Sequence, residues 1–446
     1  MNTVRVVQSA TLDRWDVKHV LAALWMRPTS EVARFGDVAE RRIEPNDVGA
    51  RYGSVHFDGH ISRRADILTI KGATYLAHPK DVVFSRIDVR NGAIGVMPDD
   101  YGALAFTNEY PIYDVISKER LLPDYVQLLC RTKVFRSQVQ AMVVGHSGRK
   151  RVSAEFFETI PIPVPLASEQ QEITSAHQAA LSNSSRMRSD SDLVLRDAVA
   201  EITEALGLRS PDVAPIRGAF LVDSHLPDRW SVFAAVSAVR GIRDGLESSY
   251  PVRPLGSEDL ATVNYGISKS PRNRPGRNIH PYLRVANVQD GYLDLSQIKH
   301  IDVPSEQLPL FKLEPGDVLI CEGNSAELVG RPALWHGEIE NCVHQNHILR
   351  VRCHRDILLP EYLLAYMQTS SSRGHYRRRA KNTTNLSTIN STDVRELPVP
   401  IPPLPQQKAV ADIWLKARRS AELLLASAAS EECRALAETE ARIAGS

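Results

Sequence analysis

The sequence has few cysteines, no long apolar run and almost no net charge, and each absence excludes a class of protein. The five cysteines, in 446 residues, form no disulfide framework, which fits a reducing cytoplasm. No run approaches the roughly 20 apolar residues that span a bilayer, and the N-terminus lacks the apolar core of a signal peptide. We therefore expect a cytoplasmic protein without a membrane partner. A net charge of +1 leaves only local basic clusters to attract nucleic acid.

Familiar catalytic motifs are also missing from the sequence. It contains no GxxxxGK[ST] phosphate loop, no GxGxxG after a strand, no Asn-Pro-Pro-aromatic segment, no GxSxG elbow and no HExxH helix. The chain is therefore not expected to be an enzyme. One segment offers metal ligands: Cys342, His344, His347, Cys353 and His354. Their spacing matches no structural zinc pattern, and the segment has the alternation of a strand, so a strand with a loop is favoured over a metal site.

What the chain does contain is a phrase used twice. "PIPVPLASEQQ" (Pro161–Gln171) returns as "PVPIPPLPQQ" (Pro398–Gln407). Other pairs follow the same order along the chain: "LDRWDVKHV" with "PDRWSVFAA", "HPKDVVFSRID" with "EPGDVLICEGN", and "LLPDYVQLL" with "LLPEYLLAY". Matches that keep their order indicate an internal duplication and not chance similarity of turns.

Each copy has the same predicted layout. A body of short β-branched runs contains one helix that begins at a Leu-Pro-acid-Tyr step. Alternating prolines then form an extended strut, because each Pro restricts itself and the residue before it. After the strut, about 40 residues without Gly or Pro predict a helix roughly 60 Å long. Its narrow apolar stripe needs a partner helix, and the other copy offers one.

The predicted class is therefore α+β, with two mixed α/β bodies in a pseudo-twofold repeat separated by a long antiparallel two-helix coiled coil. The expected divisions are residues 1–165 and 209–403 for the bodies, and residues 166–208 and 404–446 for the helices.

Basic clusters occur at corresponding places in the two copies. Such clusters can neutralise phosphates, and Arg and Asn can also pair with base edges. Repetition of these clusters favours DNA over a solvated surface turn. The residues expected to bind DNA are Arg149, Lys150 and Arg151 in the first copy, and Lys269, Arg272, Arg274, Arg277, Arg373, Arg377, Arg378, Arg379, Lys381 and Asn382 in the second.

At this point the chain resembles the specificity (S) subunits of type I restriction-modification systems. The likeness covers nearly the whole sequence, and the Pro-rich strut followed by Gln-Gln is its most specific motif. The second copy also resembles the family through "YLRVANVQDGYLDL", "LEPGDVLICEGNS" and "NTTNLSTINSTDVRELPVPIPPL". The first copy departs from it, because "GHSGRKRVSAEFFETIPIP" replaces the usual polar Ser/Asn-Leu-Ser segment.

The resemblance implies a non-catalytic DNA reader used in phage defence and DNA methylation. Each body would be a target-recognition domain for half of a split double-stranded target, with a spacer set by the helices. Two methyltransferase (M) subunits and the restriction/translocase (R) subunits would be partners, and Gln170, Gln171, Gln406 and Gln407 are expected to contact them. S-adenosylmethionine, ATP and Mg²⁺ would be cofactors of those partners, with none in this chain. A coiled-coil scaffold or adaptor of a defence complex, without sequence-specific reading, remains the alternative.

Overall fold

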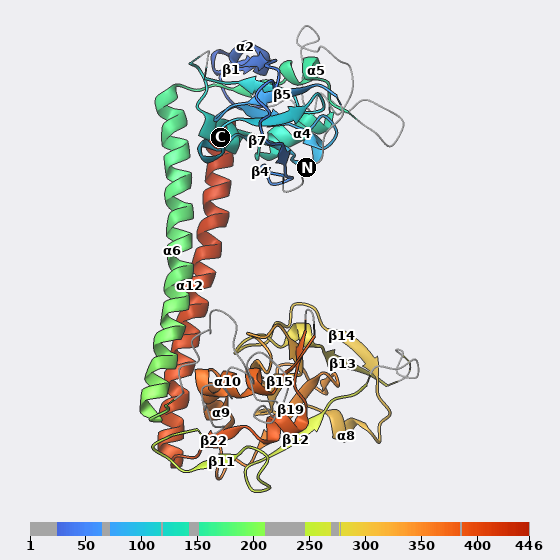
Figure 1. The fold of residues 1–446 in the computed structure, drawn as a ribbon, viewed down its shortest axis with the longest axis vertical. Coiled ribbons are helices and arrows are strands. Elements are labelled where there is room, and N and C mark those ends of the chain that lie inside the picture. Colours follow the sequence, from blue (N-terminus) through green and yellow to red (C-terminus); the bar gives the residue numbers. More distant parts are fainter. Residues whose placement is uncertain are drawn as a thin grey trace. The chain divides into compact units, whose positions relative to one another are not determined.

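The chain folds as two compact units in a computed structural model (Figure 1). Unit 1 comprises Met1–Met187 and Ala426–Ser446, and unit 2 comprises Arg188–Leu425. The structure describes residues 25–64, 72–116, 119–141, 151–209, 246–268, 276, 278–383 and 386–445. The segments Leu12–Val20 and Pro227–Ala235, which open the two copies in the sequence, lie outside these ranges.

Unit 1 is built around an antiparallel four-stranded sheet with the strand order β2-β9-β6-β7. Smaller two-stranded sheets pair β1 with β10, β3 with β4, and β5 with β8. The strands are β1 Val32–Arg34, β2 Glu40–Arg42, β3 Gly53–Val55, β4 Ile61–Arg63, β5 Thr74–Ala77, β6 Val82–Phe84, β7 Ile94–Val96, β8 Leu104–Thr107, β9 Ile112–Asp114 and β10 Pro161–Pro163. The short helices are α2 Phe35–Val38, α3 Pro123–Leu129, α4 Lys133–Ala141 and α5 Ala154–Glu158, with 3₁₀ turns η2 Thr29–Glu31, η3 Val89–Asn91 and η4 Asp99–Tyr101.

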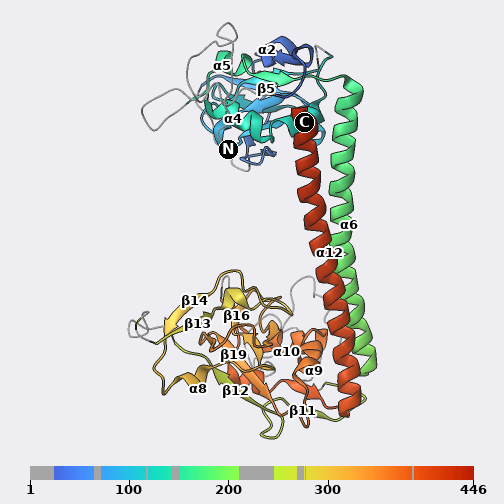
Figure 2. The same cartoon turned by 180° about the vertical axis from the view of Figure 1, so that it is seen from behind.

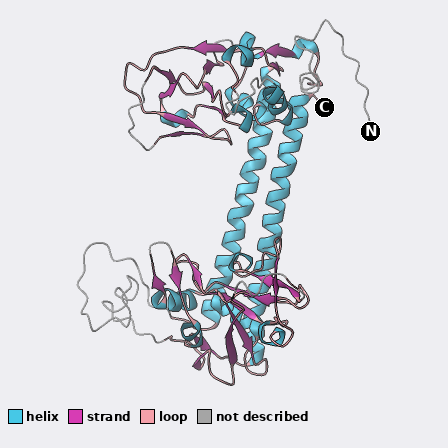
Figure 3. Ribbon diagram, turned by 90° about the vertical axis from the view of Figure 1, so that its right-hand side faces the viewer, coloured by secondary structure: helices cyan, strands magenta, loops and turns pink. Residues whose placement is uncertain are grey.

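Unit 2 repeats this plan around the sheet β12-β19-β15-β17. Figure 3 shows strands and short helices in both units. It adds two three-stranded sheets, β14-β13-β18 and β16-β21-β20, and the pair β11-β22. The strands are β11 Val252–Pro254, β12 Ala261–Tyr265, β13 Ile279–Leu283, β14 Lys299–Asp302, β15 Val318–Cys321, β16 Gly323–Asn324, β17 Pro332–Leu334, β18 Val343–His344, β19 Ile348–Cys353, β20 Lys381–Asn382, β21 Ser387–Thr388 and β22 Pro398–Pro400. The helices are α8 Leu308–Phe311, α9 Pro360–Met367, α10 Ser370–Arg379 and α11 Ser391–Arg395, with the 3₁₀ turn η6 Val285–Asn287.

The two main sheets are the same structure built twice. Taken in chain order, their four strands lie first–fourth–second–third in both units. Within the central strand, Val82 pairs with Tyr113 and Val96, and Val318 pairs with Val351 and Leu334. Both central strands are fully buried, which explains their continuous apolar sequences. The duplication predicted from the sequence is therefore present in the fold.

The body helix of each copy begins where the sequence predicts. Pro123 opens α3 and Pro360 opens α9, each followed by an acidic residue in the first turn. Both prolines follow a residue in extended geometry, so neither interrupts a helical hydrogen bond. Next, the struts form edge strands: β10 pairs antiparallel with β1, and β22 pairs with β11.

Two long helices leave the struts, α6 (Ala167–Ala205) and α12 (Leu404–Ala444). They lie side by side and run antiparallel (Figures 1 and 2). In unit 1, His177 Nδ1 lies 2.9 Å from Thr439 Oγ1 and Ser184 Oγ donates to Glu432 at 2.5 Å. In unit 2, Ser191 Oγ donates to the Ala421 carbonyl at 3.3 Å. The predicted α+β class with two mixed bodies and two long antiparallel helices is confirmed. The helices are shared between the units instead of forming divisions of their own.

The end of α12 is fastened to the start of the first body by Arg27. Its side chain is only 6% exposed and forms ion pairs with Glu31 at 2.8 Å and Glu169 at 2.6 Å. Its Nε also donates to the Ile443 carbonyl at 3.0 Å, in the last turn of α12. One guanidinium thus satisfies carbonyls that a helix end would otherwise leave without a partner.

Each unit has its own apolar core. In unit 1, Ile173 of α6 and Ile443 of α12 join the aromatic cluster of Phe35, Phe84 and Phe157. In unit 2, α6 contributes Ile202 and α12 contributes Val410, Ala411 and Trp414 to the core around α9 and β15, and Leu206, which directly follows α6, joins them. Among the described helices, none combines the length and apolarity that crossing a bilayer requires.

Candidate nucleic-acid interface

A buried glutamine in the first turn of each long helix forms the joint between that helix and its body. Gln170 and Gln407 are both fully buried. The Oε1 of Gln170 accepts from Leu122 N–H at 2.9 Å, and its Nε2 donates to the carbonyls of Arg120 and Pro165, both at 2.8 Å. These bonds tie the start of α6 to the start of α3 and to the strut.

Gln407 makes the same three bonds one repeat later. It accepts from Leu359 N–H at 2.8 Å and donates to the carbonyls of Ile357 at 2.7 Å and Pro402 at 2.9 Å. Every partner is displaced by 237 residues from its counterpart in the first copy. Because both amides are buried with their bonds used inside the chain, the structure gives Gln170 and Gln407 a structural role instead of the expected partner contact. Gln171 and Gln406 are exposed, and the partner contact remains a prediction for them.

Many of the expected DNA-binding residues lie outside the described residues. They are Arg149, Lys150, Lys269, Arg272, Arg274 and Arg277. Arg151 is described and exposed, and it forms an ion pair with Glu109 at 3.2 Å. Since both side chains are largely open to solvent, this pair would contribute little to stability and would not hold Arg151 back from another anion.

Arg373 differs from the expectation of a DNA contact. Its Nη2 lies 2.8 and 2.9 Å from the two carboxylate oxygens of Asp290, and it donates to Gln368 Oε1 at 2.7 Å. Its Nε donates to the Gln368 carbonyl at 3.2 Å. The side chain is 23% exposed and already has a carboxylate partner. We therefore assign Arg373 to bracing the 289–294 loop against α10.

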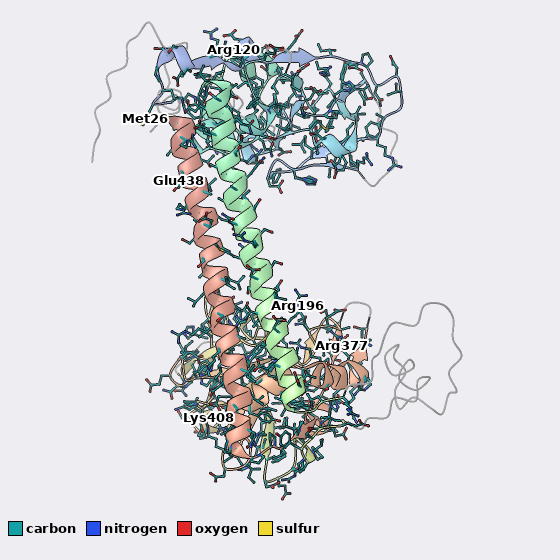
Figure 4. The ribbon with its side chains drawn as sticks, turned by 90° about the vertical axis from the view of Figure 1, so that its left-hand side faces the viewer. Met26, Arg120, Arg196, Arg377, Lys408 and Glu438 are labelled. Atoms are coloured by element: carbon teal, nitrogen blue, oxygen red, sulfur yellow. The ribbon has the colours of Figure 1, made fainter. Side chains whose placement is uncertain are left out.

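The last turn of α10 brings Arg377, Arg378 and Arg379 together (Figure 4 labels Arg377). Cations at this end of a helix also stabilise it by opposing the helix dipole. Arg379 is neutralised by an ion pair with Glu396. Arg377 is half-buried, and its Nε has no hydrogen-bond partner among the described residues. The cluster therefore keeps a positive charge immediately before β20.

Lys381 and Asn382 are exposed on β20, which follows α10 directly. The strand pairs with β21, and β21 pairs with β16, so a small three-stranded sheet carries both residues. Of the described residues expected to bind DNA, these two and Arg151 are exposed. The structure thus brings Arg377, Arg378, Lys381 and Asn382 to one part of unit 2.

The Cys/His segment forms the two strands β18 and β19 and the turn between them. His344 is fully buried, and its Nδ1 lies 3.1 Å from the Phe311 carbonyl. His347 is exposed and instead pairs with Glu322 at 2.5 Å. Burial lowers the pKa of His344 to about 4, so this imidazole is neutral in the folded protein. In the parts of the chain that the structure describes, no three His, Cys, Asp or Glu side chains converge as metal ligands do.

Sequence reasoning missed the buried ion pairs that fix the main sheets. Asp81 accepts from Arg42 Nε at 2.8 Å, and Asp317 accepts from Arg352 Nε at 2.7 Å. Each carboxylate also accepts a backbone N–H three residues earlier, from His78 and Glu314, at 2.7 Å. Burial raises the pKa of Asp81 despite these donors. The Pro-x-Asp-Val sequence that occurs in both copies was the signal that could have pointed to these two aspartates.

The comparisons with known proteins find specificity subunits of type I restriction enzymes. No protein-family model matches the chain. The chain is 23% identical over 337 residues to the type I restriction enzyme EcoKI specificity subunit of Escherichia coli, covering 74% of this chain and 66% of that protein. It is 30% identical over 170 residues to a protein of Methanocaldococcus jannaschii named as the MjaX type I specificity subunit, covering 38% of this chain and 39% of that protein. The chain thus spans less than two thirds of the length of either relative.

The fold also matches a solved structure. A chain from a study of complex assembly and conformational transition in a type I restriction-modification system superposes with a TM-score of 0.54. The superposition covers 92% of this chain and 96% of that one, at 18% identity. The likeness to type I specificity subunits expected from the Pro-rich struts is confirmed.

Proposed function

We propose that this chain is the DNA-recognition subunit of a type I restriction-modification complex. Each body would read one half of a split target in double-stranded DNA. The observation that carries the proposal is the repeated joint: two bodies with the same sheet order are each tied through the same buried glutamine to one of two paired helices. A duplicated reader fits a target with two parts, and the sequence similarity to specificity subunits supports the same conclusion.

Catalysis would belong to the partners. We infer that methyltransferase subunits and restriction subunits bind S-adenosylmethionine, ATP and Mg²⁺, while this chain contributes sequence recognition. The exposed glutamines Gln171 and Gln406, at the starts of α6 and α12, are the first positions to test for contact with a partner. Electrostatic attraction by the basic cluster after α10 would supply the sequence-independent part of DNA affinity.

The test is selection from a pool of duplexes with a random 30-base-pair core, using the chain purified with its methyltransferase partner. Enrichment of two short motifs at a fixed spacing supports the proposal. Recovery of DNA without any enriched motif would refute sequence-specific reading. A complex that assembles but shows no salt-dependent affinity for duplex DNA would favour the scaffold alternative.

A further inference from the structure

The small sheet β16-β21-β20 places three polar side chains in one row. Asn382 lies directly opposite Ser387, and Ser387 lies directly opposite Asn324 on the other side. Residues that face each other across antiparallel strands project from the same face. Ser387 is buried in the middle of the row, while Asn382 is exposed and Asn324 is half-buried.

Both amide oxygens in this row are already used within the chain. Asn382 Oδ1 accepts from Ser387 Oγ at 2.5 Å, and Asn324 Oδ1 accepts from Ser325 N–H at 2.8 Å. An asparagine reads adenine by offering an acceptor and a donor together. Each oxygen has one of its two lone pairs in use, so the Nδ2 groups carry most of the remaining hydrogen-bonding capacity of Asn382 and Asn324, which favours a ligand made of acceptors.

The backbone of the hairpin adds another donor. Thr383 N–H donates to the Leu386 carbonyl at 2.8 Å, so these two residues form the hydrogen-bonded pair that closes the turn. The next pair, Asn382 and Ser387, is then a non-hydrogen-bonded pair in the antiparallel pattern. Because β20 is the outer strand of its sheet, the N–H of Asn382 is directed away from β21.

Positive charge surrounds these donors. Lys381 is exposed on β20, and Arg377 and Arg378 belong to the preceding turn of α10. The nearby carboxylate Glu396 already has a cationic partner, Arg379, and Glu322 lies 2.5 Å from the His347 ring. An array of N–H donors with excess positive charge matches phosphate oxygens, which are acceptors with negative charge.

We propose that the β20–β21 hairpin binds the sugar–phosphate backbone of DNA and does not read bases. The inference rests on the proposed function and narrows it, because it assigns this hairpin to affinity and register and leaves sequence discrimination to other loops of unit 2. Lys381 supplies the charge, while Asn382 supplies a side-chain donor and a backbone donor.

The experiment repeats the random-duplex selection with Lys381→Gln and Asn382→Asp in the partner-bound chain. Lys408→Gln, which removes an exposed lysine from α12, is the charge-matched control (Figure 4). We expect each hairpin variant to lose roughly fivefold to tenfold in affinity for the whole pool at about 0.1 M salt. Lys381→Gln should also reduce the salt slope by about one, with the enriched motif unchanged. Asn382→Asp keeps the acceptor for Ser387 but replaces donors with a charge that repels phosphate.

Two results would overturn the inference. One is a motif that relaxes at a single base position in either variant, which would make the hairpin a base reader. The other is an affinity and a salt slope equal to those of Lys408→Gln, which would place the hairpin away from DNA. If the unsubstituted complex enriches no motif but the salt slope still falls in Lys381→Gln, sequence reading fails as the function while the phosphate contact stands.

Discussion

Replacing Gln407 with alanine should loosen the joint between α12 and the second body. The substitution leaves Leu359 N–H and the carbonyls of Ile357 and Pro402 without their bonds, in a place that is fully buried. Each lost bond costs about 1 kcal/mol, and a buried group left without a partner costs about 1–3 kcal/mol. Since backbone relaxation recovers part of this, we expect a loss of roughly 3 kcal/mol in the stability of unit 2.

The assay is native-state hydrogen exchange combined with urea unfolding followed by circular dichroism. The Leu359 amide should lose protection first, because Gln407 Oε1 is its acceptor. Gln406→Ala is the matched control: it removes the same side chain from the neighbouring exposed position and should change stability by less than about 0.5 kcal/mol. Gln407→Glu tests the chemistry, because it keeps the acceptor but turns two donors into oxygens facing carbonyls. Equal stability of Gln406→Ala and Gln407→Ala would refute the reasoning.

Three further predictions concern single side chains. The pKa of His344 is about 4, below the usual 6.5. His344 therefore contributes roughly 3 kcal/mol to the free energy of unfolding above pH 6.5, and this contribution is lost as the pH falls to 4. His344→Gln should make the free energy of unfolding depend less on pH in that range. Lys80 has φ +74° where the second copy has Gly316, so Lys80→Gly should raise the free energy of unfolding by about 1 kcal/mol and Gly316→Lys should lower it by about the same amount. Thermal unfolding would show both as shifts of the melting temperature. Arg27→Gln should cost about 2 kcal/mol in urea unfolding and expose the end of α12 to proteolysis; unchanged cleavage would contradict that.

Much of the architecture could be predicted because it depends on local chemistry. Prolines at alternating positions must be extended, and a run of about 40 residues without Gly or Pro after them can continue as one helix. The duplication then indicated which helix pairs with which. The prediction that all four glutamines of the Gln-Gln pairs contact partner subunits was wrong for Gln170 and Gln407, for a physical reason. In each copy one glutamine is buried and the other is exposed, and the sequence does not tell which. The contact with the start of α3 or α9, about 48 residues earlier, decides it.

The candidate DNA-binding residues could be predicted less well, because a half-buried basic residue that pairs with a carboxylate has less of its charge available for phosphate. Arg373 and Lys381 look equivalent in the sequence. Asp290 lies 83 residues before Arg373, yet the fold brings them to 2.8 Å. Among the described residues, no carboxylate forms an ion pair with Lys381, which is exposed. Similarly, Ser387 Oγ donates to Asn382 Oδ1 because the hairpin register places these two residues opposite each other. The composition of the segment does not reveal that register.

Comparison of the two copies separates what the fold demands from what it leaves free. Gly59 and Gly291 each follow an aspartate and have φ of +85° and +83°. Beside Gly59 lies Arg131, which donates to the Gly92 carbonyl at 2.9 Å; the residue 237 positions later is Gln368, which lies beside Gly291 with Trp414. The Asp-Gly step with positive φ is thus kept while the side chains beside it differ.

At each joint, by contrast, one backbone N–H and two backbone carbonyls need hydrogen-bond partners away from water. A glutamine side chain supplies the acceptor and the donors in both copies. Under the proposed function, two bodies that read different half-sites would need this combination: joints that fix how each helix leaves its body, and Asp-Gly steps whose neighbouring side chains can change. Exchanging Gln368 for Arg in unit 2 should therefore be tolerated poorly, because Trp414 and Arg373 already fill the place that Arg131 occupies in unit 1. The Gln170 and Gln407 joints, built from the same three bonds, should tolerate no exchange of residue type in either unit.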